Sequence, residues 1–136
     1  MQRTVKGGMD MAIERIVTDA APAPGGHYAQ ATAFNDLLFI AGQLPVRPDG
    51  THMADLPFEE QARQALANVL AIVRAGGSAP ERVLKVNVYI VGIEHWPAFN
   101  RVYAELFGEA RPARAEVPVP ELHFGYLLEV DAVAAR

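Results

Sequence analysis

Apolar residues along this chain follow two different periods, which together predict the order of its secondary structure elements. Segments in which apolar residues alternate with polar ones, or form a short continuous run, are typical of strands. Asn35 and Asp36 separate two such segments and tolerate the positive dihedral angles of a tight hairpin turn. The predicted strands lie at residues 13–17, 28–34, 37–41, 83–91, 112–118 and 127–133.

Two other segments repeat their apolar residues at helical spacing. We expect the first helix to begin after Asp55, whose carboxylate can cap free backbone amides, and to end at Gly76. The second is predicted over Trp96–Phe107, where apolar residues recur at positions i, i+3, i+4 and i+7. The predicted order is therefore three strands, a helix, a strand, a helix and two strands.

This order predicts an α+β fold, because two helices can cover one face of a sheet of about six strands. The chain has 136 residues, of which 51% are hydrophobic, and this suits one compact domain. We place that domain at residues 11–136 and expect a disordered tail at residues 1–10, which show no periodicity. The second sheet face mixes apolar residues with Lys85, Asn87 and Glu129, which favours burial against another copy in a homo-oligomer.

Composition narrows the possible classes of function. The net charge is −4 and no basic cluster is present, which makes nucleic acid an unlikely main partner. The absence of cysteine excludes disulfides, thiol nucleophiles and thiolate metal sites, and the four histidines lack metal-binding spacing. We therefore expect no metal. No signal-peptide core or membrane-spanning run is present, so we expect a cytoplasmic protein without a membrane partner.

The two C-terminal strands carry charge where strands usually carry none. Because side chains alternate along a strand, Arg114 and Glu116 share one face of the first, while Glu129 and Asp131 share one face of the second. An antiparallel pairing of these strands would hold the guanidinium and the carboxylates together on one side of the sheet. From the residues alone, this arrangement is either a cross-strand salt bridge or a binding site.

Several short motifs, in their order and spacing, resemble the RidA/YjgF family over about residues 13–136. The resemblance implies a chorismate-mutase-like fold, with two helices on one face of a six-stranded mixed sheet. It also implies a homotrimer with sites in the clefts between subunits. The motifs are GHYAQ at 26–30, AGQLP at 41–45, QARQALANV at 61–69, Asn100 with Tyr103 and Phe107, PAR at 112–114 and LEVDAVA at 128–134.

The best-understood activity of that family is hydrolysis of enamine or imine carboxylates such as 2-aminoacrylate, which gives a 2-keto acid and ammonia without a cofactor. By resemblance, Arg114 matches the arginine that grips the substrate carboxylate. Glu129 matches the acidic residue that orients or activates the hydrolytic water. Tyr28 matches a cleft tyrosine, Gly42 belongs to a loop whose backbone faces the ligand, and Asn100 matches a position near the interface.

The chain departs from the family pattern at two positions that line the expected site. Ala41 stands where many active members have Ser or Thr, so one hydroxyl contact to the ligand is missing. Glu116 stands where many have Cys, two residues after the arginine. Its carboxylate can pair with Arg114 and compete with an anionic substrate, repel that substrate, or favour a different ligand.

These departures leave two alternatives to a deaminase open. One is a non-catalytic ligand-binding or interaction trimer that kept the fold and lost the chemistry. The other follows the family labels of endoribonuclease and translation inhibitor. The acidic charge and the lack of a stripe of basic and aromatic residues argue against the second alternative.

Overall fold

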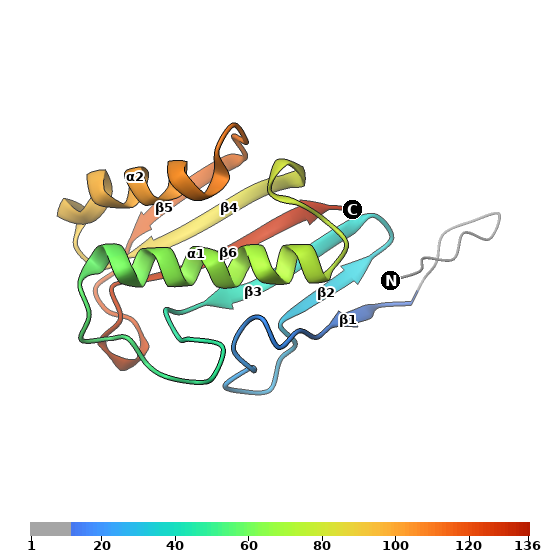
Figure 1. Ribbon diagram of the computed structural model, residues 1–136, viewed down its shortest axis with the longest axis horizontal. Helices are drawn as coiled ribbons and strands as arrows, with labels where there is room; N and C mark the ends of the chain where they lie inside the picture. Colours follow the sequence, from blue (N-terminus) through green and yellow to red (C-terminus); the bar gives the residue numbers. More distant parts are fainter. Residues whose placement is uncertain (1–11) are drawn as a thin grey trace.

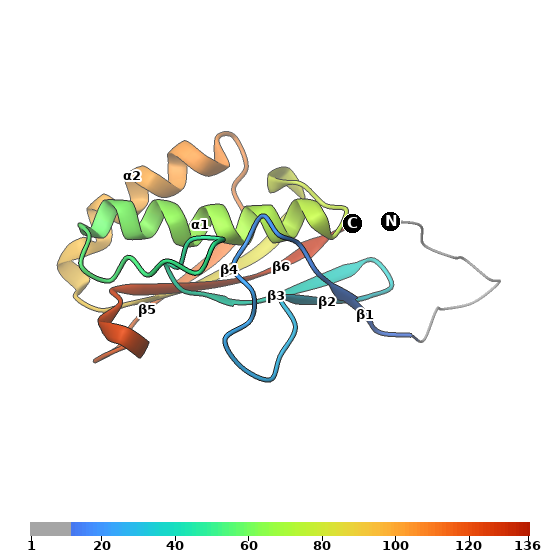
Figure 2. The ribbon, with the colours of Figure 1, turned by 60° about the horizontal axis from the view of Figure 1, so that its bottom comes forward.

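One mixed sheet with two helices on one face forms the architecture of the computed structural model, which describes residues 12–136 (Figures 1 and 2). The strand order is β1-β2-β3-β6-β4-β5, and every neighbouring pair is antiparallel except β4 and β5. This confirms the predicted α+β fold and element order. The elements are β1 (Glu14–Ile16), β2 (Ala31–Phe34), β3 (Leu37–Gln43), α1 (Phe58–Ala75), β4 (Val83–Ile90), α2 (Trp96–Phe107), β5 (Ala113–Pro118) and β6 (Leu128–Ala135).

The core lies between the sheet and the helices. Alternate residues of the inner strands point at α1 and α2 and are buried, as the period-two pattern predicts. The hairpin between β2 and β3 turns at Asn35, whose φ of 54° is tolerated by asparagine. Strand residues with at most 4% exposure in this layer are Ile16, Ala31, Ala33, Leu38, Ile40, Val86, Val88, Ile90, Leu128, Val130, Ala132 and Ala134.

Two buried polar residues of α1 attach the preceding loop to the helix. The Gln61 amide donates to the carbonyls of Ala54 and Leu56, and its oxygen accepts from the backbone N–H of Leu127. Asn68, one turn after Gln64, donates in the same way to two further loop carbonyls. These amides satisfy buried backbone groups. The motif at 61–69 therefore has a structural explanation.

Details of three predicted elements are wrong. Helix α1 begins at Phe58 with Pro57 as its N-cap, and no side chain of the described residues caps it, so Asp55 does not have the predicted role. Strict alternation over the predicted strand at 83–91 would place Leu84 on the buried face with Val86, but Leu84 is 48% exposed because the register shifts between Val83 and Lys85. Strand β2 begins only at Ala31.

The predicted tail at residues 1–10 lies outside the described residues. The assignment of residues 11–136 to a single domain stays a prediction. No helix within residues 12–136 is both long and apolar enough to cross a membrane.

The sheet face opposite the helices has no covering layer within the described chain (Figure 2). Phe39 is 45% exposed there, and it lies in register with Val133 and then Lys85. Leu37 and Val117 on the same face are 41% and 40% exposed. Apolar residues scattered among charged ones on a whole sheet face are typical of a surface that meets another protein.

Candidate functional site

The two charged strands do not pair with each other, and their charged residues lie on opposite faces of the sheet. Strand β4 lies between β5 and β6. Arg114 is in register with the buried Val86, so it points to the helix side. Glu129 is in register with Tyr89, so it points to the uncovered side. The prediction that one sheet face holds Arg114 and Glu129 together is therefore wrong.

Arg114 lies in a cluster of side chains between β5 and α2. One terminal nitrogen of its guanidinium donates to Oδ1 of Asn100 at 2.8 Å. Its central carbon lies 4.7 Å from the centroid of the Tyr103 ring, 5.6 Å from Phe99 and 5.7 Å from Trp96. Such distances give favourable cation–π contacts. We call Asn100, Tyr103, Arg114 and Glu116 the arginine cluster.

Glu116 is the unusual member of the arginine cluster. Its side chain is 0% exposed, and its nearest charge contact is a terminal nitrogen of Arg114 at 3.7 Å. That distance is too long for a hydrogen bond. No donor among residues 12–136 reaches either buried carboxylate oxygen. Burial raises the pKa of Glu116, and the charge of Arg114 opposes that rise.

Tyr103 of the arginine cluster also has a buried polar atom. Its hydroxyl is buried, and within the described part of the chain it has no hydrogen-bond partner. Burial raises the pKa of Tyr103 to about 12, while the charge of Arg114 acts in the opposite direction. Among the described residues, the arginine cluster thus contains three buried oxygen atoms that have no hydrogen-bond partner, beside one cation.

The guanidinium of Arg114 keeps capacity for a further ligand. A guanidinium has about five N–H donors, and one of them is used by Asn100. The Arg114 side chain is 23% exposed, whereas Glu116 is completely covered. Arg114 and Glu116 therefore form an ion pair without a hydrogen bond, and the exposed part of the arginine can bind an anion.

Glu129 lies against the backbone of Gly42 on the uncovered face. A Cβ atom at Gly42 would lie 2.7 Å from Oε2 of Glu129, a separation that real Cβ atoms do not show. The sequence has glycine here because the carboxylate occupies the space of a side chain. Ala41 comes directly before it on β3. We call Ala41, Gly42 and Glu129 the glutamate cluster.

Three influences act on the pKa of Glu129. Burial raises it most, the charge of His123 lowers it, and the charge of Asp131 raises it. Asp131 is held in place because it accepts hydrogen bonds from the Asn87 amide at 2.9 Å and the Tyr89 hydroxyl at 3.2 Å. A carboxylate with a raised pKa is a stronger base than an ordinary glutamate.

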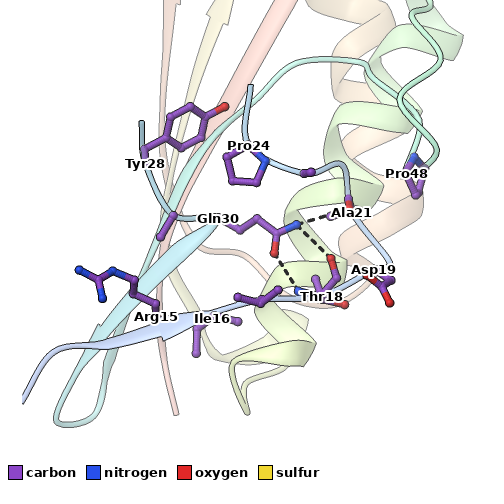
Figure 3. A pocket seen from close by; sticks show the side chains of 12 residues that line it. Arg15, Ile16, Thr18, Asp19, Ala21, Pro24, Tyr28, Gln30 and Pro48 are labelled. Atoms are coloured by element: carbon purple, nitrogen blue, oxygen red, sulfur yellow. Dashed lines mark hydrogen bonds between the residues drawn. The ribbon is translucent and has the colours of Figure 1, made fainter. Parts of the chain in front are cut away.

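Tyr28 lies in the loop between β1 and β2, on the rim of a pocket of about 400 Å³ (Figure 3). The Tyr28 side chain is 52% exposed, and its hydroxyl accepts a hydrogen bond from the backbone N–H of Gly25 at 3.2 Å. Gln30 fixes the loop through side-chain bonds to Thr18 and Pro22. A backbone bond from Ala41 to Gln30 brings this loop alongside the glutamate cluster.

The structure therefore divides the predicted site residues into two groups. Asn100, Arg114 and Glu116 belong to the β5 edge, on the helix side. The loop of Tyr28 belongs to the β1–β2 side of the sheet, the opposite edge in Figure 1, and Ala41 and Gly42 lie on β3. Within one chain, the two groups do not face a common cavity.

Sequence reasoning missed the aromatic residues around Arg114 and the influence of His123. The signal for the first was present, because Trp96, Phe99, Asn100 and Tyr103 have the spacing of one helix face. Phe99 and Tyr103 belong to the apolar pattern that predicts the second helix, and that pattern does not show that they pack around an arginine. Across residues 12–136, no group of at least three His, Cys, Asp or Glu residues is arranged to hold a metal ion.

Comparison with protein families and curated proteins identifies close relatives. The family model described as Endoribonuclease L-PSP matches residues 18–136. A RutC family protein of Pyrococcus horikoshii is 41% identical over 123 residues, covering 90% of this chain and 98% of that protein. A protein of Dermatophagoides farinae named 2-iminobutanoate/2-iminopropanoate deaminase is 34% identical over 124 residues, covering 90% and 97%.

Solved structures agree with these relatives. The crystal structure of E. coli TdcF with bound serine superposes with a TM-score of 0.86 at 33% identity, covering 90% of this chain and 98% of that one. The YjgF gene product of E. coli gives a TM-score of 0.85 at 33% identity, with coverage of 90% and 98%. Each of these structural similarities covers nine-tenths of the chain.

Proposed function

Because the chain belongs to the RidA/YjgF family, as the match over residues 18–136 shows, we propose that it hydrolyses small imine or enamine carboxylates to 2-keto acids and ammonia. The observation that carries this proposal is the presence of an arginine with N–H donors left for a ligand and a partly buried glutamate with a raised pKa. The name of the mite relative, an imine deaminase, supports the same reaction class.

The arginine cluster supplies the anchor for the substrate. Two parallel N–H groups of Arg114 bind the two oxygens of the substrate carboxylate. Asn100 holds one terminal nitrogen of the guanidinium through the 2.8 Å hydrogen bond, and the guanidinium packs against the ring of Tyr103. Anchoring by the carboxylate fixes the position of the neighbouring imine carbon.

The glutamate cluster supplies the base. Glu129 takes a proton from water as the water oxygen attacks the imine carbon, which forms a C–O bond and shifts the C=N electron pair to nitrogen. Glu129 returns that proton to the nitrogen, which gives a carbinolamine. The carbinolamine hydroxyl then loses its proton and the nitrogen gains one, so that the carbon–nitrogen bond breaks and ammonia leaves as the carbonyl forms. An enamine first takes a proton on carbon to become the imine. The backbone of Ala41 and Gly42 lines the site, and Tyr28 closes its rim.

We further propose that the site forms between copies of the chain in a homotrimer. Two observations support this assembly. The two clusters lie on opposite sheet faces within one chain, so a second copy must bring a glutamate cluster to an arginine cluster. The uncovered sheet face also exposes Phe39, Leu37 and Val117, which burial between subunits would stabilise.

The direct test generates 2-iminobutanoate or 2-aminoacrylate in situ with an amino acid oxidase or dehydratase and follows ammonia release. We expect the protein to accelerate release, and Arg114→Ala to lower kcat/KM by at least about 100-fold because the carboxylate anchor is lost. Glu81→Gln, an exposed change in the short 3-10 helix (Pro80–Arg82) before β4, is the matched control. No acceleration by the wild-type protein, or an undiminished rate in Arg114→Ala, would contradict the proposal.

A further inference from the structure

The positive charge of Arg114 is already balanced by the neighbouring carboxylate of Glu116 before any substrate binds. Glu116 places a carboxylate oxygen 3.7 Å from the guanidinium, and its side chain is 0% exposed while that of Arg114 is 23% exposed. The arginine therefore lies between a buried negative charge and the open side of the site. Water cannot screen Glu116 from its neighbours as it would screen a surface carboxylate.

Glu116 does not hold the arginine in place. No hydrogen bond joins the two side chains, and the geometry of the guanidinium is set by the Asn100 bond and by stacking on Tyr103. Both oxygens of Glu116 also lack a donor among the described residues. A residue that neither orients the arginine nor satisfies its own oxygens acts on the site mainly through its charge.

That charge opposes an anionic ligand. A substrate carboxylate bound to the exposed side of Arg114 lies within a few ångströms of a second, like charge. The like charge weakens the attraction that a lone arginine would provide. A carboxamide in the same place keeps one oxygen that accepts from the guanidinium, and because it carries no charge it meets no such repulsion.

We propose that Glu116 is a specificity-determining residue, which compensates the charge of Arg114 and so lowers the preference of the site for a carboxylate over the matching carboxamide. The substrate class then extends to small imines whose acid group is masked as an amide. This inference rests on the proposed function, since it concerns the same arginine.

The test measures equilibrium binding of two unreactive keto compounds, 2-oxobutanoate and 2-oxobutanamide, at pH 8 by calorimetry. Glu116→Gln keeps the shape and removes the charge. We expect it to tighten 2-oxobutanoate about tenfold, equivalent to about 1.4 kcal/mol, and to change 2-oxobutanamide less than about twofold. Glu116→Met also removes the charge, and unlike glutamine its side chain has no amide group to donate or accept hydrogen bonds. It should give the same shift if charge is the cause.

Glu81→Gln removes one negative charge from an exposed position just before β4 and should leave both affinities unchanged. An unchanged preference in both Glu116 variants, with thermal melting as in the wild type, would overturn the inference. Failure of either ligand to bind any variant would overturn it as well. Binding needs no turnover, so a shifted preference without imine hydrolysis would contradict the proposed reaction and leave the role of Glu116 intact.

Discussion

The arginine cluster and the glutamate cluster differ in how the fold holds them. Arg114 is surrounded by aromatic rings of α2 and by a buried counter-charge, and it reaches the surface only at one end. Glu129 lies on the uncovered sheet face, with the bare backbone of Gly42 beneath it. Each cluster is therefore complete in its own elements, and neither depends on the other for its geometry. If the two clusters act in one site, as proposed, a second copy of the chain must join them.

The largest expected change in activity comes from mixing two inactive variants, one with a damaged arginine cluster and one with a damaged glutamate cluster. Arg114→Ala and Glu129→Gln should each be nearly inactive alone. When they are co-expressed, a site that takes its arginine from one chain and its glutamate from the next is intact in about a quarter of random arrangements. We therefore expect recovery to about a quarter of the wild-type rate, measured as ammonia release.

The matched control replaces the Glu129→Gln chain by one that carries both substitutions. No chain in that mixture has Arg114, so no activity should return. If the original mixture stays as inactive as its components, while native mass spectrometry shows mixed oligomers, the two clusters do not combine across an interface.

A change at Gly42 tests whether the two clusters are independent, because it damages only the glutamate cluster. Gly42→Ala places a methyl group 2.7 Å from Oε2 of Glu129, which is too close, so the carboxylate must move by about 1 Å. We expect kcat to fall about 10- to 100-fold because the base is displaced. Binding of 2-oxobutanoate, which depends on Arg114, should change less than about twofold.

Gly25→Ala is a suitable control because no atom outside its immediate neighbours lies within 4 Å of the added Cβ. It should leave kcat unchanged. Equal loss of kcat in both alanine variants, or loss of 2-oxobutanoate binding in Gly42→Ala, would show that the clusters are not independent.

The sequence predicted the fold well because its strongest signals are local. The period-two segments and the apolar stripe of Trp96–Phe107 each depend on neighbouring residues, and both correspond to observed elements. The hairpin at Asn35 is local in the same sense.

Which residues the fold brings together at the site was harder to predict from the sequence. Alternation shows that Arg114 and Glu116 share a face, but it does not show which strand lies next to theirs. The insertion of β4 between β5 and β6, and the choice of face, are long-range properties of the sheet. Glu116 illustrates the same limit. Its position next to the arginine follows from the sequence, whereas its complete burial without a hydrogen bond follows from packing under α2.

The smallest expected effect is a shift in the pH dependence of the reaction, and it concerns the glutamate cluster alone. Because the pKa of Glu129 is raised, kcat/KM should fall as the pH drops through a value above that of an ordinary glutamate, since the protonated acid cannot accept a proton from water. Asp131→Asn removes a charge that raises this pKa and should move the acid limb to lower pH. His123→Gln removes a charge that lowers it and should move the limb to higher pH. The two variants thus act in opposite directions on one group. Their pH–rate profiles should differ while 2-oxobutanoate binding at a fixed pH stays the same, and shifts of the same sign would assign the acid limb to a group other than Glu129.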